Sequence, residues 1–160
     1  MNQKKFLLIV ILLATVAASI TTYLITNKDY ATYCNSNQIT KMTSVIIGNS
    51  SITVEVADTP QLQECGLMFR DHLDSSTGML FIFEKEDRWT FWMKNMHMPV
   101  DIIWINADHK IVDIRSSVPP CTSFFCETYQ PSEPAKYVLE VNAGYADAHG
   151  IKINDRVIVK

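Results

Sequence analysis

The sequence has few cysteines, few glycines and no surplus of basic residues, and these shortages narrow the class of protein. Its 160 residues include four cysteines and five glycines and carry a net charge of −3. Without a basic surplus we expect no nucleic-acid partner, and without an acidic block we expect no disordered acidic tail. Internal repeats and low-complexity tracts are also absent from the sequence. About one globular domain with a short extra segment remains.

Recognisable catalytic motifs are missing as well. The sequence contains no Gly-x-Ser-x-Gly, no His-Glu-x-x-His and no glycine-rich phosphate loop. It has no Cys-x-x-Cys pair either, which argues against a structural zinc site and against thioredoxin-like redox chemistry. The sequence therefore favours a binding or accessory module, for a small ligand or an envelope protein, over an enzyme, and we expect no cofactor.

The one long apolar run lies at the N-terminus. Lys4 and Lys5 precede an uninterrupted apolar or small-residue stretch from Phe6 to Ile25. Twenty residues of helix span roughly 30 Å, which matches a bilayer core. Residues 1–28 are therefore a transmembrane anchor or a cleavable signal peptide. In the second case, Val16-Ala17-Ala18 supply the small residues before the cleavage site. Either reading exports the rest of the chain, and an uncleaved run would contact the membrane.

After the leader, the pattern predicts a tether and then one mostly β domain. Residues 29–42 are polar and without period, and residues 43–160 contain short alternating or apolar runs separated by turn signals. This spacing is typical of a small β-sandwich or barrel-like domain, without a parallel βαβ frame. The predicted strands are 44–47, 52–56, 79–83, 90–93, 102–105, 111–114, 137–141 and 157–159.

Two short helices are expected between these strands. Thr59 and Pro60 are typical of an N-cap followed by the first helical residue. Asn142 is the predicted N-cap of a second helix over residues 143–149, with Gly150 at its left-handed end.

The four cysteines suggest disulfides in an oxidising compartment. Cys121 and Cys126 are close enough in sequence to close one loop, and Cys34 and Cys65 would then remain as a second pair. Four cysteines allow three pairings, and the spacing does not choose among them.

Several sequence segments, taken in order, resemble a family known as domain-of-unknown-function family 192. The resemblance covers about residues 51–159 and rests on Val54–Pro60, Gly66–Arg70, Gly78–Phe83, Phe91–Asn95 and Tyr137–Gly144. It implies a compact, mostly β, often exported domain, and it brings no assigned reaction. Cys65 and the run Met96-His97-Met98 depart from the family's pattern.

Polar residues among the apolar strands are the candidate ligand-binding site. Beside the aromatic rings of Trp92 and Trp104, such a pocket would suit a small polar ligand. In the alternative interpretation, Lys94–Asp101 and Arg70–Glu140 are ion pairs that fasten loops to the sheet. The candidate residues are Arg70, Trp92, Lys94, Asn95, Asp101, Glu140 and Asn142.

Two further hypotheses use residues of the same region. Asp101 and Glu140 could act as acid and base of an envelope hydrolase. Alternatively, the thioethers of Met96 and Met98, with Met93 and the imidazole of His97, could bind Cu(I), which prefers soft ligands.

Overall fold

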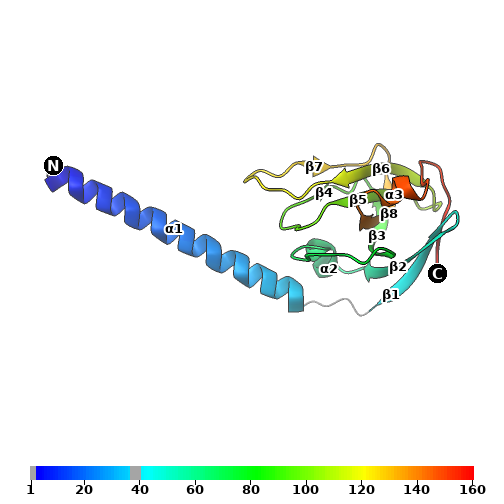
Figure 1. Cartoon of the computed structure of the whole chain (residues 1–160), viewed down its shortest axis with the longest axis horizontal. Coiled ribbons are helices and arrows are strands. Elements are labelled where there is room, and N and C mark those ends of the chain that lie inside the picture. Colours follow the sequence, from blue (N-terminus) through cyan, green and yellow to red (C-terminus); the bar gives the residue numbers. More distant parts are fainter. Residues whose placement is uncertain (1–2, 37–40) are drawn as a thin grey trace. The chain divides into compact units, whose positions relative to one another are not determined.

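The computed structural model describes residues 3–36 and 41–160, which fall into two separate units divided after Ser36 (Figure 1). The first unit is helix α1, Gln3–Ser36. It contains the predicted leader and continues into the predicted tether, whose residues 37–40 lie outside the described chain. No helix among the described residues has the length and hydropathy of a membrane span.

The second unit is a mostly β domain built on a curled seven-stranded sheet, which confirms the barrel-like prediction. The strand order across the sheet is β6-β5-β8-β3-β2-β1-β9. Two short strands, β4 and β7, pair separately beside it. The strands are β1 Met42–Ile47, β2 Ser50–Ala57, β3 Thr77–Asp87, β4 Phe91–Trp92, β5 Val100–Ile105, β6 Ile111–Val118, β7 Thr128–Tyr129, β8 Ala135–Asn142 and β9 Val157–Val159.

Helix α2, Pro60–Cys65, connects β2 to β3. Its predicted N-cap is confirmed, because the hydroxyl of Thr59 accepts a hydrogen bond from the Leu62 N–H at 3.4 Å. Strands β2 and β3 run parallel to each other, so the expectation of no parallel βαβ unit was wrong. The whole connection over residues 58–76 makes this crossover, and its only helix, six residues long, gives a weak periodic signal.

Helix α3, Tyr145–Ala148, follows β8, and its N-cap is Gly144 rather than the predicted Asn142. Asn142 instead pairs with Val100 as the last residue of β8. Asparagine is common both at strand ends and at N-caps, and here the sheet extends further than the local pattern indicated. Gly144 has φ of 78°, a left-handed conformation that suits glycine.

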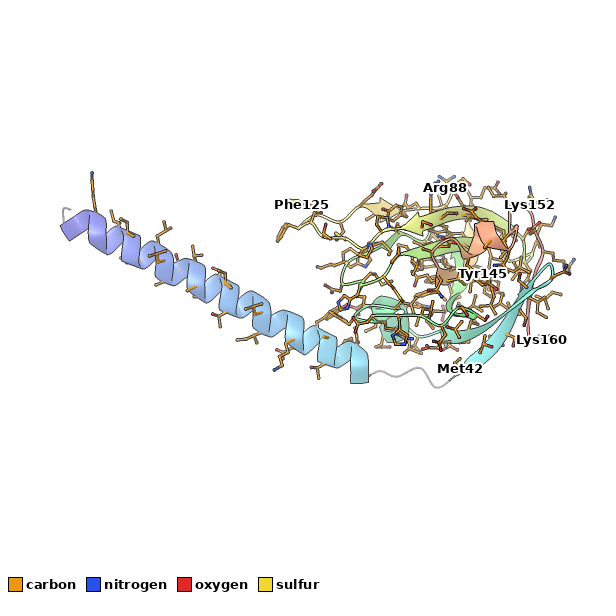
Figure 2. The ribbon with its side chains drawn as sticks, viewed as in Figure 1. Met42, Arg88, Phe125, Tyr145, Lys152 and Lys160 are labelled. Carbon is orange, nitrogen blue, oxygen red and sulfur yellow. A yellow bond between two sulfur atoms is a disulfide. The ribbon has the colours of Figure 1, made fainter. Side chains whose placement is uncertain are left out.

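Both faces of the sheet are covered, which gives the domain two apolar layers. One face carries Val54, Leu80, Leu139 and Ile103 and packs against α3, where Tyr145 points into the interior (Figure 2). The other face carries buried aliphatic and aromatic side chains: Met79, Phe81, Ile102 and Trp104. The Phe91 ring of β4 packs edge-on against Phe81 and Trp104, and α2 with the residues after it lies beside Phe81. The candidate site lies on this second face.

Candidate functional site

Glu140 is the polar residue that the strand register brings onto the second face. In β8 it lies opposite Ile102 of β5 and opposite Met79 of β3. Met79 in turn lies opposite Glu55 of β2, so one row of side chains crosses the sheet with a glutamate on either side of Met79. Gly78, beside this row, allows β3 to approach β8 closely, because a Cβ there would lie 2.5 Å from the backbone oxygen of Glu140.

The Glu140 side chain lines a pocket on this face. The pocket encloses about 40 Å³ and is partly open to solvent, and its walls come from α2, the residues after it, β3 and β4. It is mostly apolar and aromatic in character, with Gly66, Met68, Phe81, Phe91, Trp92 and Met96 around the acid. Gly66 contributes through its small size, since a Cβ there would lie 3.1 Å from the Phe81 ring.

The Glu140 carboxyl oxygens reach the pocket surface, and they have no hydrogen-bonding partner among the residues that the structure describes. The residue is only 4% exposed, and no described donor contacts its carboxyl oxygens. Burial disfavours the charged form and raises the pKa of Glu140 to about 8, and the positive charge of Arg70 opposes this rise. At neutral pH the group is therefore mainly the uncharged acid.

Arg70 does not form the predicted ion pair with Glu140. Its two terminal nitrogens donate to the two carboxyl oxygens of Glu55, at 2.5 and 2.7 Å. The hydrogen bond from Arg70 to Glu55 raises the pKa of the guanidinium, and burial partly offsets this effect. Arg70 is thus committed to Glu55, and it influences Glu140 through its field rather than through a direct bond.

The predicted Lys94–Asp101 pair is also absent. Asp101 is fully buried and accepts three backbone N–H groups, from Ser117, Gly144 and Ala146, at 2.7–2.8 Å. Its carboxylate thereby ties the end of β6 to the start of α3. Lys94 instead lies over the ring of Trp92, 5.2 Å from its centroid.

This geometry contradicts the hypothesis of an Asp101–Glu140 acid–base pair. Asp101 lies opposite Val141, whereas Glu140 lies opposite Ile102. Side chains alternate between the two faces along a strand, so the two carboxyls point to opposite sides of the sheet. No substrate atom in the pocket could reach both.

The two candidate asparagines hold loops near the pocket. Asn142 donates to the carbonyls of Leu73 and Asp74, at 3.0 and 2.9 Å. Asn95 has φ of 58°, and its carbonyl accepts from the N–H of Phe69 at 2.8 Å. These contacts position the segment after α2, which forms part of the pocket wall.

The residues proposed for copper binding point in different directions. Met96 and Met98 are buried, and Met96 lines the pocket. His97 is half exposed and lies 2.8 Å from a carboxyl oxygen of Asp71. The structure therefore does not gather the imidazole with the thioethers, and His, Cys, Asp and Glu form no metal-binding group among the described residues.

The Cys121–Cys126 disulfide is present and closes a projecting loop. Phe124 and Phe125, at the tip of this loop, are 86% and 84% exposed, and Figure 2 shows Phe125 pointing away from the sheet. No cysteine among the described residues is free. The predicted pairing of Cys34 with Cys65 stays a prediction.

Sequence reasoning missed several residues of this site, among them Glu55, Gln63, Phe81 and Phe91. Glu55 alternates with Val54 and Val56, a pattern that indicates a solvent face, yet its face of the sheet is covered. Gln63 joins α2 to β3 by donating to the Ile82 carbonyl at 2.7 Å. The two phenylalanines resemble ordinary core residues. Only the nearby Arg70, which needs an acidic partner, could have pointed to Glu55.

Comparisons with known proteins agree with this fold. The family model DUF192, described as "Uncharacterized ACR", matches residues 43–159. A UPF0127 protein of Pyrococcus furiosus is 28% identical over 108 residues, covering 66% of this chain and 85% of the relative. A Sinorhizobium meliloti structure described as a candidate transcription regulator has a TM-score of 0.65 at 33% identity, covering 74% of this chain and 92% of that one. A protein of unknown function from Novosphingobium aromaticivorans has the same TM-score and identity, covering 73% and 83%.

Proposed function

We propose that this chain, which belongs to the DUF192 family, is a binding module that acts outside the cytoplasm and holds a small ligand in the Glu140 pocket. The observation that carries the proposal is the buried carboxyl of Glu140, which faces an aromatic pocket without a described partner. Buried polar groups are almost always satisfied in folded proteins. A ligand would supply the missing partner.

The size and lining of the pocket favour a small, mostly apolar ligand. Pockets for drug-sized molecules enclose about 300–1,000 Å³. The present pocket, at about 40 Å³, lies far below that range. It has room for one small group of a ligand or partner, and the remainder of that molecule would lie at the entrance. Trp92 is 46% exposed at its wall, so the entrance has an aromatic surface for the incoming group.

Export is supported by two independent features. The Cys121–Cys126 disulfide is consistent with an oxidising compartment. The apolar run from Phe6 to Ile25, preceded by Lys4 and Lys5, is typical of a signal peptide or a membrane anchor. Mass spectrometry of the mature N-terminus would choose between them, since a signal peptide is removed and an anchor is retained. A mature chain found in the cytoplasm with reduced cysteines would contradict export.

The binding proposal is tested with a ligand panel on the purified full chain. Small metabolites, sugars and peptidoglycan fragments are screened by thermal unfolding. A ligand at one hundred times its Kd raises the free energy of unfolding by about 2.7 kcal/mol, which is easily detected. Trp92→Ala should abolish the rise because it removes part of the pocket wall.

Phe124→Ala is the matched control, since it removes an exposed aromatic ring outside the pocket and should leave binding unchanged. Two results would overturn the proposal. One is a panel without any stabilising compound, and the other is a stabilisation that Trp92→Ala does not reduce.

A further inference from the structure

The charged groups around Glu140 leave its carboxyl uncompensated. Arg70 is held by both carboxyl oxygens of Glu55, so its charge acts on Glu140 only from a distance. Glu64 is exposed at the pocket rim, and Lys94 lies over Trp92 on the neighbouring β4 segment. None of these groups neutralises a carboxylate at position 140 by direct contact. A buried, unpaired charge is very costly, so the acid stays protonated.

A protonated carboxyl in such a pocket is a hydrogen-bond donor. No hydrogen bond joins this carboxyl to a described residue, and the surfaces around it are mostly aromatic rings and thioethers. The pKa of about 8 agrees with this state at neutral pH. A carboxylic acid kept neutral by an apolar site can donate to an oxygen of a bound molecule.

The positive charges nearby select against the opposite ligand class. An ammonium group would need Glu140 to ionise and would feel repulsion from Arg70, whose charge already acts on Glu140. It would also compete with Lys94 for the face of Trp92. A carbonyl or carboxylate oxygen meets neither obstacle.

We propose that the pocket recognises an acceptor oxygen, a carbonyl or a carboxylate, on a small apolar ligand, and that the Glu140 side chain donates the hydrogen bond to it. This inference rests on the proposed function, and it adds the chemical class of the ligand and the protein group that binds its oxygen. Gln63 is not available for this role through its N–H₂ group, which donates to the backbone carbonyl of Ile82.

Four probes of similar size test the inference on the full chain: phenylacetamide, phenylacetate, 2-phenylethylamine and propylbenzene. Binding is measured by titration calorimetry at pH 7 and pH 9. We expect the two oxygen acceptors to bind at least tenfold more tightly than the amine and the hydrocarbon. Their affinity should fall about tenfold from pH 7 to pH 9, because Glu140 loses its proton across this range.

Variants separate the donor from the charge. Glu140→Gln keeps an N–H donor, so it should retain acceptor binding and lose the pH dependence. Glu140→Leu should weaken acceptor binding by tenfold or more, because the bond to the ligand is lost. Glu84→Gln, at an exposed position of β3, is the control and should behave as the parent chain does.

Tighter binding of 2-phenylethylamine, with release of about one proton at pH 7, would overturn the inference. Acceptor binding that Glu140→Leu leaves unchanged would also overturn it. If the probes fail and the ligand panel yields only compounds without an acceptor oxygen, this inference is wrong and the binding proposal stands. If neither the probes nor the panel gives a ligand, both are wrong.

Discussion

Glu140→Gln should make the protein more stable at neutral pH, which is an unusual result for a change at a buried site. The folded state holds the Glu140 proton with a pKa of about 8, whereas the ordinary value is 4.5. Between these two values the unfolded chain ionises and the folded chain does not. Unfolding therefore releases a proton, and the free energy of unfolding falls as the pH rises. Below pH 4.5 Glu140 is protonated in both the folded and the unfolded state, so this loss of stability disappears.

The magnitude follows from the same two pKa values. At pH 7, ionisation of the unfolded chain lowers the free energy of unfolding by about 3 kcal/mol relative to acidic pH. Glutamine is neutral in both states, so Glu140→Gln removes this loss. Its melting temperature at pH 7 should exceed that of the parent chain by on the order of 10 °C, and the two should converge near pH 4.

Urea unfolding from pH 4 to pH 9 is the appropriate assay, with Glu84→Gln as the exposed control. Taking the difference between parent and variant removes the contributions of all other titrating groups. Parallel stability profiles over the whole range would show that Glu140 is ionised in the folded state. That outcome would refute the burial argument.

Two further substitutions test how the sheet around the pocket is held. Asp101→Asn replaces one acceptor oxygen of a carboxylate that binds three backbone N–H groups, so it should lower the free energy of unfolding by about 3 kcal/mol. Urea unfolding measures this loss, and Asp108→Asn at an exposed position should leave the free energy of unfolding almost unchanged. Gly78→Ala should cost about 3 kcal/mol because the new methyl group meets the Glu140 carbonyl. Gly48→Ala, which has φ of 57° and open space, should cost about 1 kcal/mol, and equal losses at the two glycines would contradict the proposed close approach of β3 and β8.

Local patterns predicted the parts of the fold that local chemistry determines. The hairpin of β5 and β6 formed as expected because Asn106 accepts the Lys110 N–H through its side chain and His109 adopts φ of 58°. The start of α2 was also predictable from local chemistry, because Thr59 caps the helix and Pro60 occupies its first position. The parallel pairing of β2 with β3 depends on a crossover and on burial of both sheet faces, and neither leaves a periodic signal in the sequence.

The candidate site shows the same limit at the level of single residues. The sequence singled out Arg70, Trp92 and Glu140, and the structure places Trp92 and Glu140 in one pocket. Their partners were not predictable, because a shift of one residue in register moves a side chain to the other face. Asp101 and Glu140 lie on neighbouring strands, yet this one-residue offset separates them completely.

The three buried acidic residues of the described domain differ in what surrounds their carboxyl groups. They are Asp101, Asp113 and Glu140. Asp101 accepts three backbone N–H groups, and Asp113 accepts those of Ile114 and Ser132. Such bonds fasten loops to the sheet. Glu140 is equally buried, has no such donors and opens onto a pocket. Since the same chain satisfies its other buried carboxyls from its own backbone, the missing partner of Glu140 is best supplied from outside.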